Sequence, residues 1–94
     1  MVAKINTDEA KKILSEENCV LLDVRTEEEY SLDKINPSVH LDLFDDFEKK
    51  IGNLDKEKKY LVLCRSGNRS RVATSILRDE GFEAYNVEGG ILDW

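Results

Sequence analysis

The 94-residue chain has few of the residues that cross-link a fold or ligate a metal. It contains two cysteines, Cys19 and Cys64, which are too few for a disulfide scaffold and, with no signal peptide visible, favour a reducing compartment. A single histidine and the lack of any Cys-x-x-Cys pair argue against a metal site. We therefore expect no metal and no cofactor, and we expect any reactive cysteine to act as a thiolate.

Long hydrophobic runs are missing as well. The longest, Cys19–Leu22 and Tyr60–Cys64, fall far short of the ~20 residues that a membrane-spanning helix needs. Acidic residues outnumber basic ones by 20 to 14, so the formal net charge is −6, and neither nucleic acid nor an anionic membrane is expected as the main partner. With 40% hydrophobic residues the chain can still form a core, and we expect one cytoplasmic, monomeric domain over residues 1–94.

Short apolar runs alternate with amphipathic stretches along the chain. Strands are expected at Lys4–Ile5, Cys19–Val24, Val39–Leu41, Tyr60–Cys64 and Ala84–Val87. Helices are expected after an N-cap at Thr7, after the capping box Thr26–Glu29, from Leu43 to a stop at Gly52, and over Ser70–Glu80. This alternation predicts βαβ units and a small three-layer α/β/α fold with a mainly parallel sheet.

Several further residues are expected to have structural roles. The phenylalanines and one face of the last helix are assigned to the core: Phe44, Phe47, Phe82, Val72, Ala73, Ile76 and Leu77. Cys19 begins a buried strand without basic or glycine-rich surroundings, so we expect it to be structural. Asp23 and Arg25, at the end of the same strand, are expected to form a structural ion pair, because a buried charge needs a partner. His40 is expected to be a packing or surface residue.

The segment Cys64–Ser70 has the features of a reactive site. It joins a buried strand to an amphipathic helix at the carboxyl end of the predicted sheet, where parallel sheets bind their ligands. Gly67 permits a positive φ that lets successive amides face an anion, and the helix N-terminus adds its dipole. Arg65 and Arg69 add positive charge, and Arg69 is the better candidate for bidentate contact with an oxyanion. These features favour a nucleophilic Cys64 thiolate over the alternative, a buried cysteine in an ordinary turn.

The sequence resembles the rhodanese-like (sulfurtransferase) family over nearly its whole length. The matching motifs are Leu21–Arg25 with Glu28–Tyr30, the loop Cys64–Ser70, and Gly89–Gly90 followed by Trp94. The resemblance implies a five-stranded, mostly parallel sheet flanked by helices. It also implies that Cys64 takes sulfane sulfur from a small anionic donor such as thiosulfate, forming a persulfide. That sulfur would then pass to cyanide, to a thiol or to a carrier protein.

By the same resemblance, the backbone amides of the loop would hold the persulfide and the donor. The substrate-binding residues expected on this basis are Arg65, Ser66, Gly67, Asn68, Arg69 and Ser70. The side chains of Arg65 and Arg69 would attract the anionic donor.

Two alternatives stay open. One is a rhodanese-like module that relays sulfur between proteins, or binds a partner, without turnover on small donors. The other is a cysteine-loop phosphatase, which the spacing disfavours. Cys64 and Arg69 form a Cys-x4-Arg arrangement, whereas such phosphatases have Cys-x5-Arg, and the position of their arginine is Ser70 here.

Overall fold

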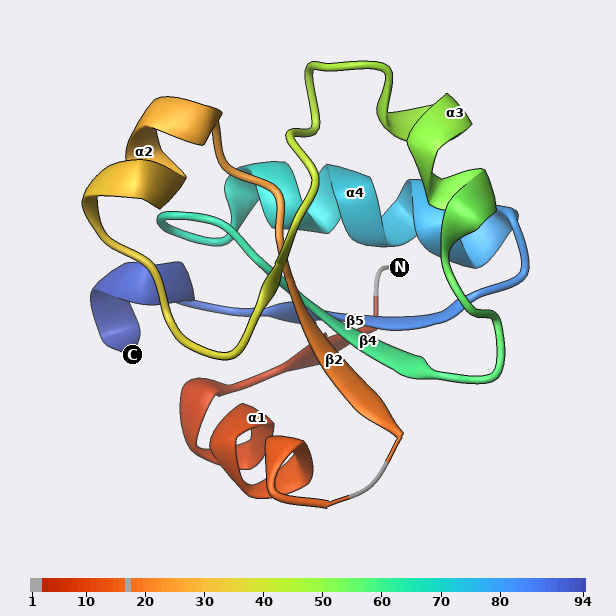
Figure 1. The fold of residues 1–94 in the computed structure, drawn as a ribbon. Coiled ribbons are helices and arrows are strands. Elements are labelled where there is room, and N and C mark those ends of the chain that lie inside the picture. Colours follow the sequence, from red (N-terminus) through yellow and green to blue (C-terminus); the bar gives the residue numbers. More distant parts are fainter. Residues whose placement is uncertain (1–2, 17) are drawn as a thin grey trace.

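The computed structural model describes residues 3–16 and 18–94 and contains a five-stranded sheet (Figure 1). The strands are β1 (Lys4–Ile5), β2 (Cys19–Asp23), β3 (Val39–His40), β4 (Lys59–Leu63) and β5 (Glu83–Val87). Their order is β1-β5-β4-β2-β3, and every neighbouring pair is parallel. The expected α/β fold with a parallel five-stranded sheet is therefore confirmed.

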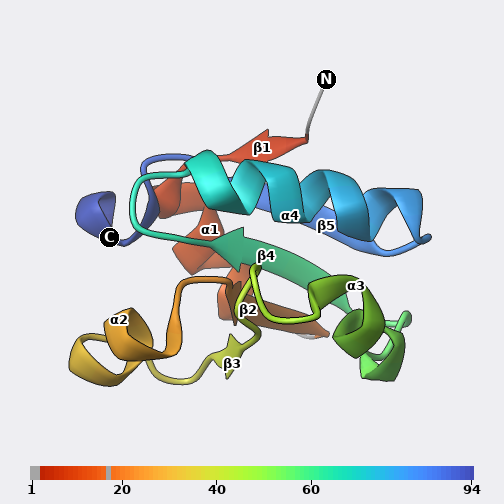
Figure 2. The ribbon, with the colours of Figure 1, turned by 90° about the horizontal axis from the view of Figure 1, so that it is seen from above.

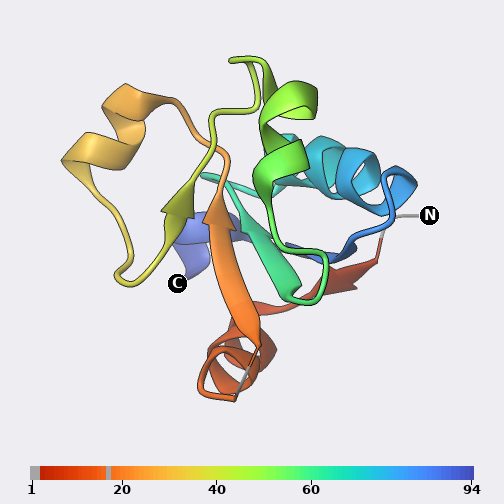
Figure 3. The ribbon, with the colours of Figure 1, turned by 45° about the vertical axis from the view of Figure 1, so that its right-hand side comes forward.

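Helices cover both faces of this sheet. They are α1 (Thr7–Leu14), α2 (Glu27–Leu32), α3 (Phe47–Lys50) and α4 (Asn68–Asp79), with two short 3-10 helices, η1 (Ile51–Asn53) and η2 (Gly90–Asp93). Helix α1 lies on one face, and α3 and α4 lie on the other (Figure 3). None of the helices in the described part of the chain has the length and hydrophobicity needed to cross a bilayer.

The side-chain alternation of the central strand β4 builds a core on each face of the sheet. Tyr60 and Val62 point to the α4 side, where they pack with residues such as Leu77 and Phe82. Leu61 and Leu63 point to the α1 side. Both faces of β4 are thus covered, which explains why the strand is a continuous apolar run in the sequence.

The first helix begins one residue earlier than the sequence predicts. Its N-cap is Asn6, whose side chain accepts the amide of Glu9 at 2.8 Å, and the Glu9 carboxylate accepts the amide of Asn6 at 3.3 Å. The assignment of Thr7 as N-cap is therefore wrong. Asparagine and threonine are both good caps, and the side chain of Thr7 is instead buried, with its hydroxyl donating to Asp93. The capping box at Thr26 and Glu29 is confirmed.

Helix α3 is much shorter than expected, and Phe44 is not in the core. The chain makes turns over residues 43–46, and the Asp42 carboxylate accepts the amide of Phe44 at 2.9 Å, which favours a turn over a helix. Phe44 is consequently 72% exposed. Gly52 does not stop the helical path, which continues to Asn53 as η1.

The core face of α4 also differs in one position. Val72 is 50% exposed, whereas Ala73 and Leu77 are fully buried. The remaining phenylalanines, Phe47 and Phe82, are buried as expected.

Candidate active site

The loop after β4 lies at one end of the molecule together with α2 and η2 (Figure 2). Cys64 follows the last residue of β4 and is 1% exposed, and α4 begins four residues later at Asn68. Gly67 caps this helix with a φ of 101°, the left-handed conformation that the sequence predicts there. The structure thus places the cysteine between a strand end and a helix N-terminus.

Hydrogen bonds to the sulfur favour the thiolate of Cys64. The amide of Gly67 donates to Sγ at 3.1 Å, and the hydroxyl oxygen of Ser70 lies 3.3 Å from Sγ. Burial of Cys64 raises its pKa, but the Ser70 hydroxyl and the backbone amides of Ser70, Gly67 and Ser66 outweigh this, so that the pKa is lowered. The groups that lower this pKa are therefore dipoles, a hydroxyl and backbone amides, around a buried sulfur.

Ser70 and Asn86 form a buried hydrogen-bond chain behind the sulfur. The Ser70 hydroxyl donates to Oδ1 of Asn86, and Nδ2 of Asn86 donates to the carbonyl of Gly67 at 3.1 Å. A hydroxyl has one proton, so Ser70 can donate either to Asn86 or to Sγ. The thiol of Cys64 can donate to Ser70 in the first arrangement, and the thiolate accepts from Ser70 in the second. Asn86 is not among the site residues expected from the sequence, where its only signal is a polar residue inside a predicted buried strand.

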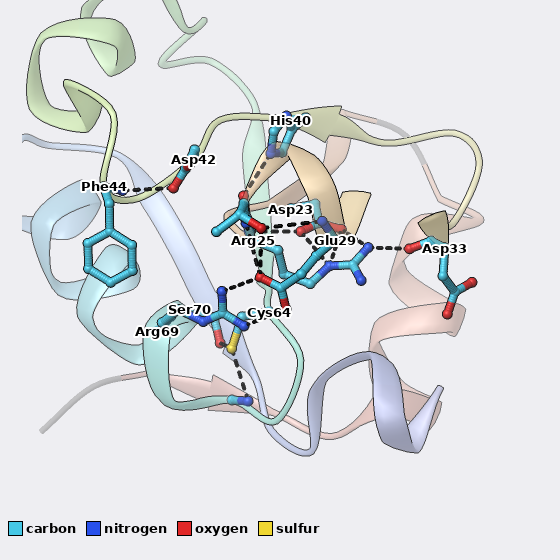
Figure 4. A network of polar contacts seen from close by, with 12 residues as sticks. Asp23, Arg25, Glu29, Asp33, His40, Asp42, Phe44, Cys64, Arg69 and Ser70 are labelled. Atoms are coloured by element: carbon cyan, nitrogen blue, oxygen red, sulfur yellow. Dashed lines mark hydrogen bonds and ion pairs between the residues drawn. The ribbon is translucent and has the colours of Figure 1, made fainter. Parts of the chain in front are cut away.

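Arg69 differs from its expected arrangement because its guanidinium is already paired. Nη1 and Nη2 of Arg69 lie 2.6 and 3.0 Å from the two carboxylate oxygens of Glu29 (Figure 4). Glu29 belongs to α2, forty residues away in the sequence, where the pattern indicates only its role in a capping box. Its pKa is lowered to about 2, chiefly by the hydrogen bond from Arg69, so the pair is charged at neutral pH.

The other residues of the loop contribute to the surroundings of Sγ mainly through their backbone amides. The side chains of Arg65, Ser66 and Asn68 are exposed, and Gly67 and Ser70 are buried. The loop therefore surrounds Sγ with amides while its longer side chains face outward.

The two glycines at the start of η2 let the chain approach the loop closely. The amides of Ile91 and Leu92 donate to the carbonyls of Cys64 and Arg65 at 2.9 and 3.1 Å. A Cβ on Gly90 would lie well under 3.0 Å from both carbonyl groups, and its φ is 59°. By holding these carbonyls, η2 directs the following amides toward the sulfur.

A buried ion pair lies at the end of the neighbouring strand β2. Arg25 Nη2 lies 2.8 Å from Asp23 Oδ2, and both side chains are nearly inaccessible, as expected for a structural pair. Arg25 also donates to the carbonyl of Asp33 beyond α2. His40 stacks on Tyr30 with ring centroids 4.4 Å apart and lies 2.7 Å from the carbonyl of Arg25, which agrees with a packing role.

Cys19 lies outside this site. It lines a pocket of about 470 Å³ next to α1 and Trp94, and the described residues around that pocket do not include the loop. Burial raises the pKa of Cys19, so it lacks the activation found at Cys64. Within residues 3–16 and 18–94, no group of three or more His, Cys, Asp or Glu side chains is arranged to hold a metal ion.

Comparisons with known proteins agree with this geometry. Residues 6–94 match the rhodanese-like domain. The putative sulfurtransferase YtwF of Bacillus subtilis is 39% identical over 94 residues, covering 99% of this chain and 90% of the relative. The thiosulfate sulfurtransferase GlpE of Pseudomonas savastanoi pv. phaseolicola is 37% identical over 89 residues, covering 92% of this chain and 81% of GlpE.

A solved structure gives the same result for the fold. The crystal structure of a rhodanese-like domain protein from Staphylococcus aureus superposes with a TM-score of 0.90 at 32% identity, covering 99% of this chain and 91% of that one. The match in sequence and fold shows that this chain belongs to the rhodanese-like domain family.

Proposed function

We propose that the protein is a sulfurtransferase that takes sulfane sulfur from an anionic donor such as thiosulfate and carries it on Cys64. The acceptor is a thiophile: cyanide in an assay, or a thiol or sulfur-carrier protein. The observation that carries the proposal is the buried Sγ of Cys64, which accepts the amide of Gly67 at 3.1 Å in front of the N-terminus of α4. The relatives named as sulfurtransferases support it.

The chemistry takes place in two displacements. In the first, the Cys64 thiolate attacks the outer sulfur of thiosulfate, the sulfur–sulfur bond breaks, and sulfite leaves with the electron pair. The product is a persulfide on Cys64. In the second, the acceptor attacks the outer sulfur of the persulfide and the Cys64 thiolate leaves, so that cyanide becomes thiocyanate. Neither leaving group needs a proton, and no general acid is required.

The loop supplies the stabilisation that these steps need. Negative charge lies first on Sγ and then on the outer sulfur of the persulfide. Fixed amides and a helix N-terminus stabilise such charge without having to reorganise during the reaction. Gly67 and Ser70 already contact Sγ in the described structure.

The environment of Ser70 also favours sulfur transfer over phosphate hydrolysis. A phosphatase of this loop type would have its arginine at this position, but the Ser70 side chain is buried between Sγ and Asn86. The position of the phosphatase arginine is thus taken by a buried serine.

The test is sulfur transfer to Cys64. The protein is incubated with thiosulfate and analysed by intact mass spectrometry, with Cys64→Ser and Cys19→Ser as matched variants. We expect one added sulfur atom on the wild type and on Cys19→Ser, none on Cys64→Ser, and release of thiocyanate when cyanide is added.

Three results would change the conclusion. If the wild type gains no sulfur, the proposal is wrong. If the persulfide forms but cyanide does not turn it over, the protein is a relay module. Hydrolysis of an aryl phosphate that is lost in Cys64→Ser would indicate a phosphatase. The monomeric state and the cytoplasmic location stay predictions.

A further inference from the structure

We propose that Glu29 is a specificity-determining residue, which competes with the sulfur donor for the guanidinium of Arg69 and so disfavours dianionic donors relative to monoanionic ones. The inference rests on the proposed transfer of sulfur through Cys64. Its chemical meaning is that the preferred donor carries a single negative charge, as the anion of an organic persulfide or of a thiosulfonate does.

Glu29 occupies the face of the Arg69 guanidinium that presents Nη1 and Nη2 together. Glu29 takes Nη1 of Arg69 with one carboxylate oxygen and Nη2 with the other, at 2.6 and 3.0 Å. A sulfonate group that binds this face of the guanidinium in the usual bidentate geometry would use the same two donors. An anionic donor therefore has to displace the Glu29 carboxylate before it can bind Arg69 in this way.

The Glu29 carboxylate is also held by hydrogen bonds within its own helix cap. Its Oε1 accepts the amide of Thr26 at 3.2 Å and the hydroxyl of Thr26 at 3.1 Å, which forms the capping box of α2. Moving Glu29 away from Arg69 would therefore also break hydrogen bonds at the start of a helix. The carboxylate that competes with the donor for Arg69 is therefore held in place by the capping box of α2.

The charges around Cys64 are then largely compensated. Arg25 is neutralised by Asp23 in a buried pair, and Arg69 is neutralised by Glu29. Arg65 extends outward from the loop with an exposed side chain. The amides and the helix dipole can hold one negative charge at the sulfur, but the second charge of a dianion would compete with Glu29 for the guanidinium of Arg69.

Arg69 lies close enough to Cys64 for its charge to matter there. The pKa of Arg69 is raised first by the hydrogen bond to Glu29, and the negative charge of Cys64 also contributes to the rise. Removing the negative charge of Glu29 would thus add an uncompensated positive charge within the electrostatic field of the nucleophile.

The chain offers a well-matched pair of variants. Glu29→Gln removes the charge but keeps an amide that can serve in the capping box. Glu28→Gln makes the same change in net charge on the same helix, one residue away, at an exposed side chain. A difference between the two variants that disappears when Arg69 is also replaced reports the contact with Arg69 rather than the overall charge or the helix cap.

The experiment compares two donors that transfer the same kind of sulfur atom. Thiosulfate is a dianion and releases sulfite, whereas methanethiosulfonate is a monoanion and releases methanesulfinate. We expect Glu29→Gln to raise kcat/KM for thiosulfate roughly five- to tenfold, mainly through KM, with little change for methanethiosulfonate. Glu28→Gln should change the two donors equally, and the gain should be lost in the double variant Glu29→Gln/Arg69→Gln.

A binding measurement separates this inference from the proposed function. Sulfate is an inert dianion, and calorimetry should show that it binds more tightly to Glu29→Gln than to the wild type or to Glu28→Gln. If no variant takes sulfur from either donor, the proposed function is wrong, but the sulfate affinities still test the role of Glu29.

Two outcomes would overturn the role of Glu29. The first is an equal change for both donors, and the second is an unchanged affinity for sulfate. If Glu29→Gln does not fold, Glu29→Asp serves in its place. Its shorter side chain keeps the charge but loses the two-pronged contact, so the same effects are expected in smaller size.

Discussion

The pKa of Cys64 is lowered by groups that differ in how firmly they are held. The amide of Gly67 is fixed by the backbone, whereas the hydroxyl of Ser70 has to turn between Asn86 and Sγ. Burial opposes ionisation, so these hydrogen bonds have to outweigh a desolvation penalty before the pKa falls. The Ser70 hydroxyl is the one among them that a side-chain substitution can remove.

We predict that Ser70→Ala raises the pKa of Cys64. Iodoacetamide alkylates the thiolate form of cysteine, so the alkylation rate follows the fraction of Cys64 that is ionised. As the pH is lowered, this rate should therefore begin to fall at a higher pH in Ser70→Ala than in the parent protein. The measurement is the pH profile of the alkylation rate in a Cys19→Ser background, where only Cys64 reacts. Identical profiles would mean that the backbone amides alone set the pKa.

At the scale of elements, the site depends on η2 as much as on the loop itself. The start of η2 contacts the carbonyls of Cys64 and Arg65, and only a residue without a Cβ fits at Gly90. The Gly89–Gly90 turn thus acts as a support for the loop although it contributes no side chain.

We predict that Gly90→Ala lowers both sulfur transfer and thermal stability. The added Cβ would clash with two backbone carbonyls and would also occupy a left-handed conformation, so the loop has to move. We expect at least a tenfold loss of kcat/KM, measured alongside the melting temperature. Gly52→Ala is the matched control, because a Cβ added there would have no neighbouring atom within 4 Å, and it should leave the activity unchanged.

Elements with a strong local pattern could be predicted from the sequence, and contacts between distant segments could not. The apolar runs of β2 and β4 and the Thr26 capping box are local signals, and each is confirmed. The cap at Asn6 is predicted one residue off, because two neighbouring residues both favour that position.

The site contacts that the sequence did not predict were missed for a different reason. The contact of Glu29 with Arg69 spans forty residues and that of Ser70 with Asn86 spans sixteen, and neither leaves a periodic trace in the sequence. The positions of Cys64 and Gly67 could be predicted because one short segment contains the strand end, the turn and the helix start. The partner of Arg69 depends on how α2 packs beside α4.

At the scale of the whole molecule, the position of the site depends on the packing of the core on both faces of the sheet. The loop follows β4, whose side chains alternate between the two faces, so we expect a change of packing on either face to affect the strand end. A small domain has a free energy of unfolding of only about 5–15 kcal/mol, so a single cavity consumes a large part of it.

We predict that Leu61→Ala, on the face opposite α4, lowers the free energy of unfolding by about 2–5 kcal/mol, because its side chain is fully buried. Leu32→Ala, at a side chain that is 88% exposed, should change it by less than about 0.5 kcal/mol. Urea denaturation followed by circular dichroism measures both. Similar values for the two variants would mean that the α1 face contributes little to stability.

The backbone amides around Sγ bear on how the reactivity of Cys64 depends on salt concentration. Dissolved ions screen charges on exposed side chains, but they do not reach dipoles buried against a sulfur atom. Because the Ser70 hydroxyl and the backbone amides, rather than mobile surface cations, lower the pKa of Cys64, we expect the reactivity of this cysteine to be similar in dilute and in concentrated salt.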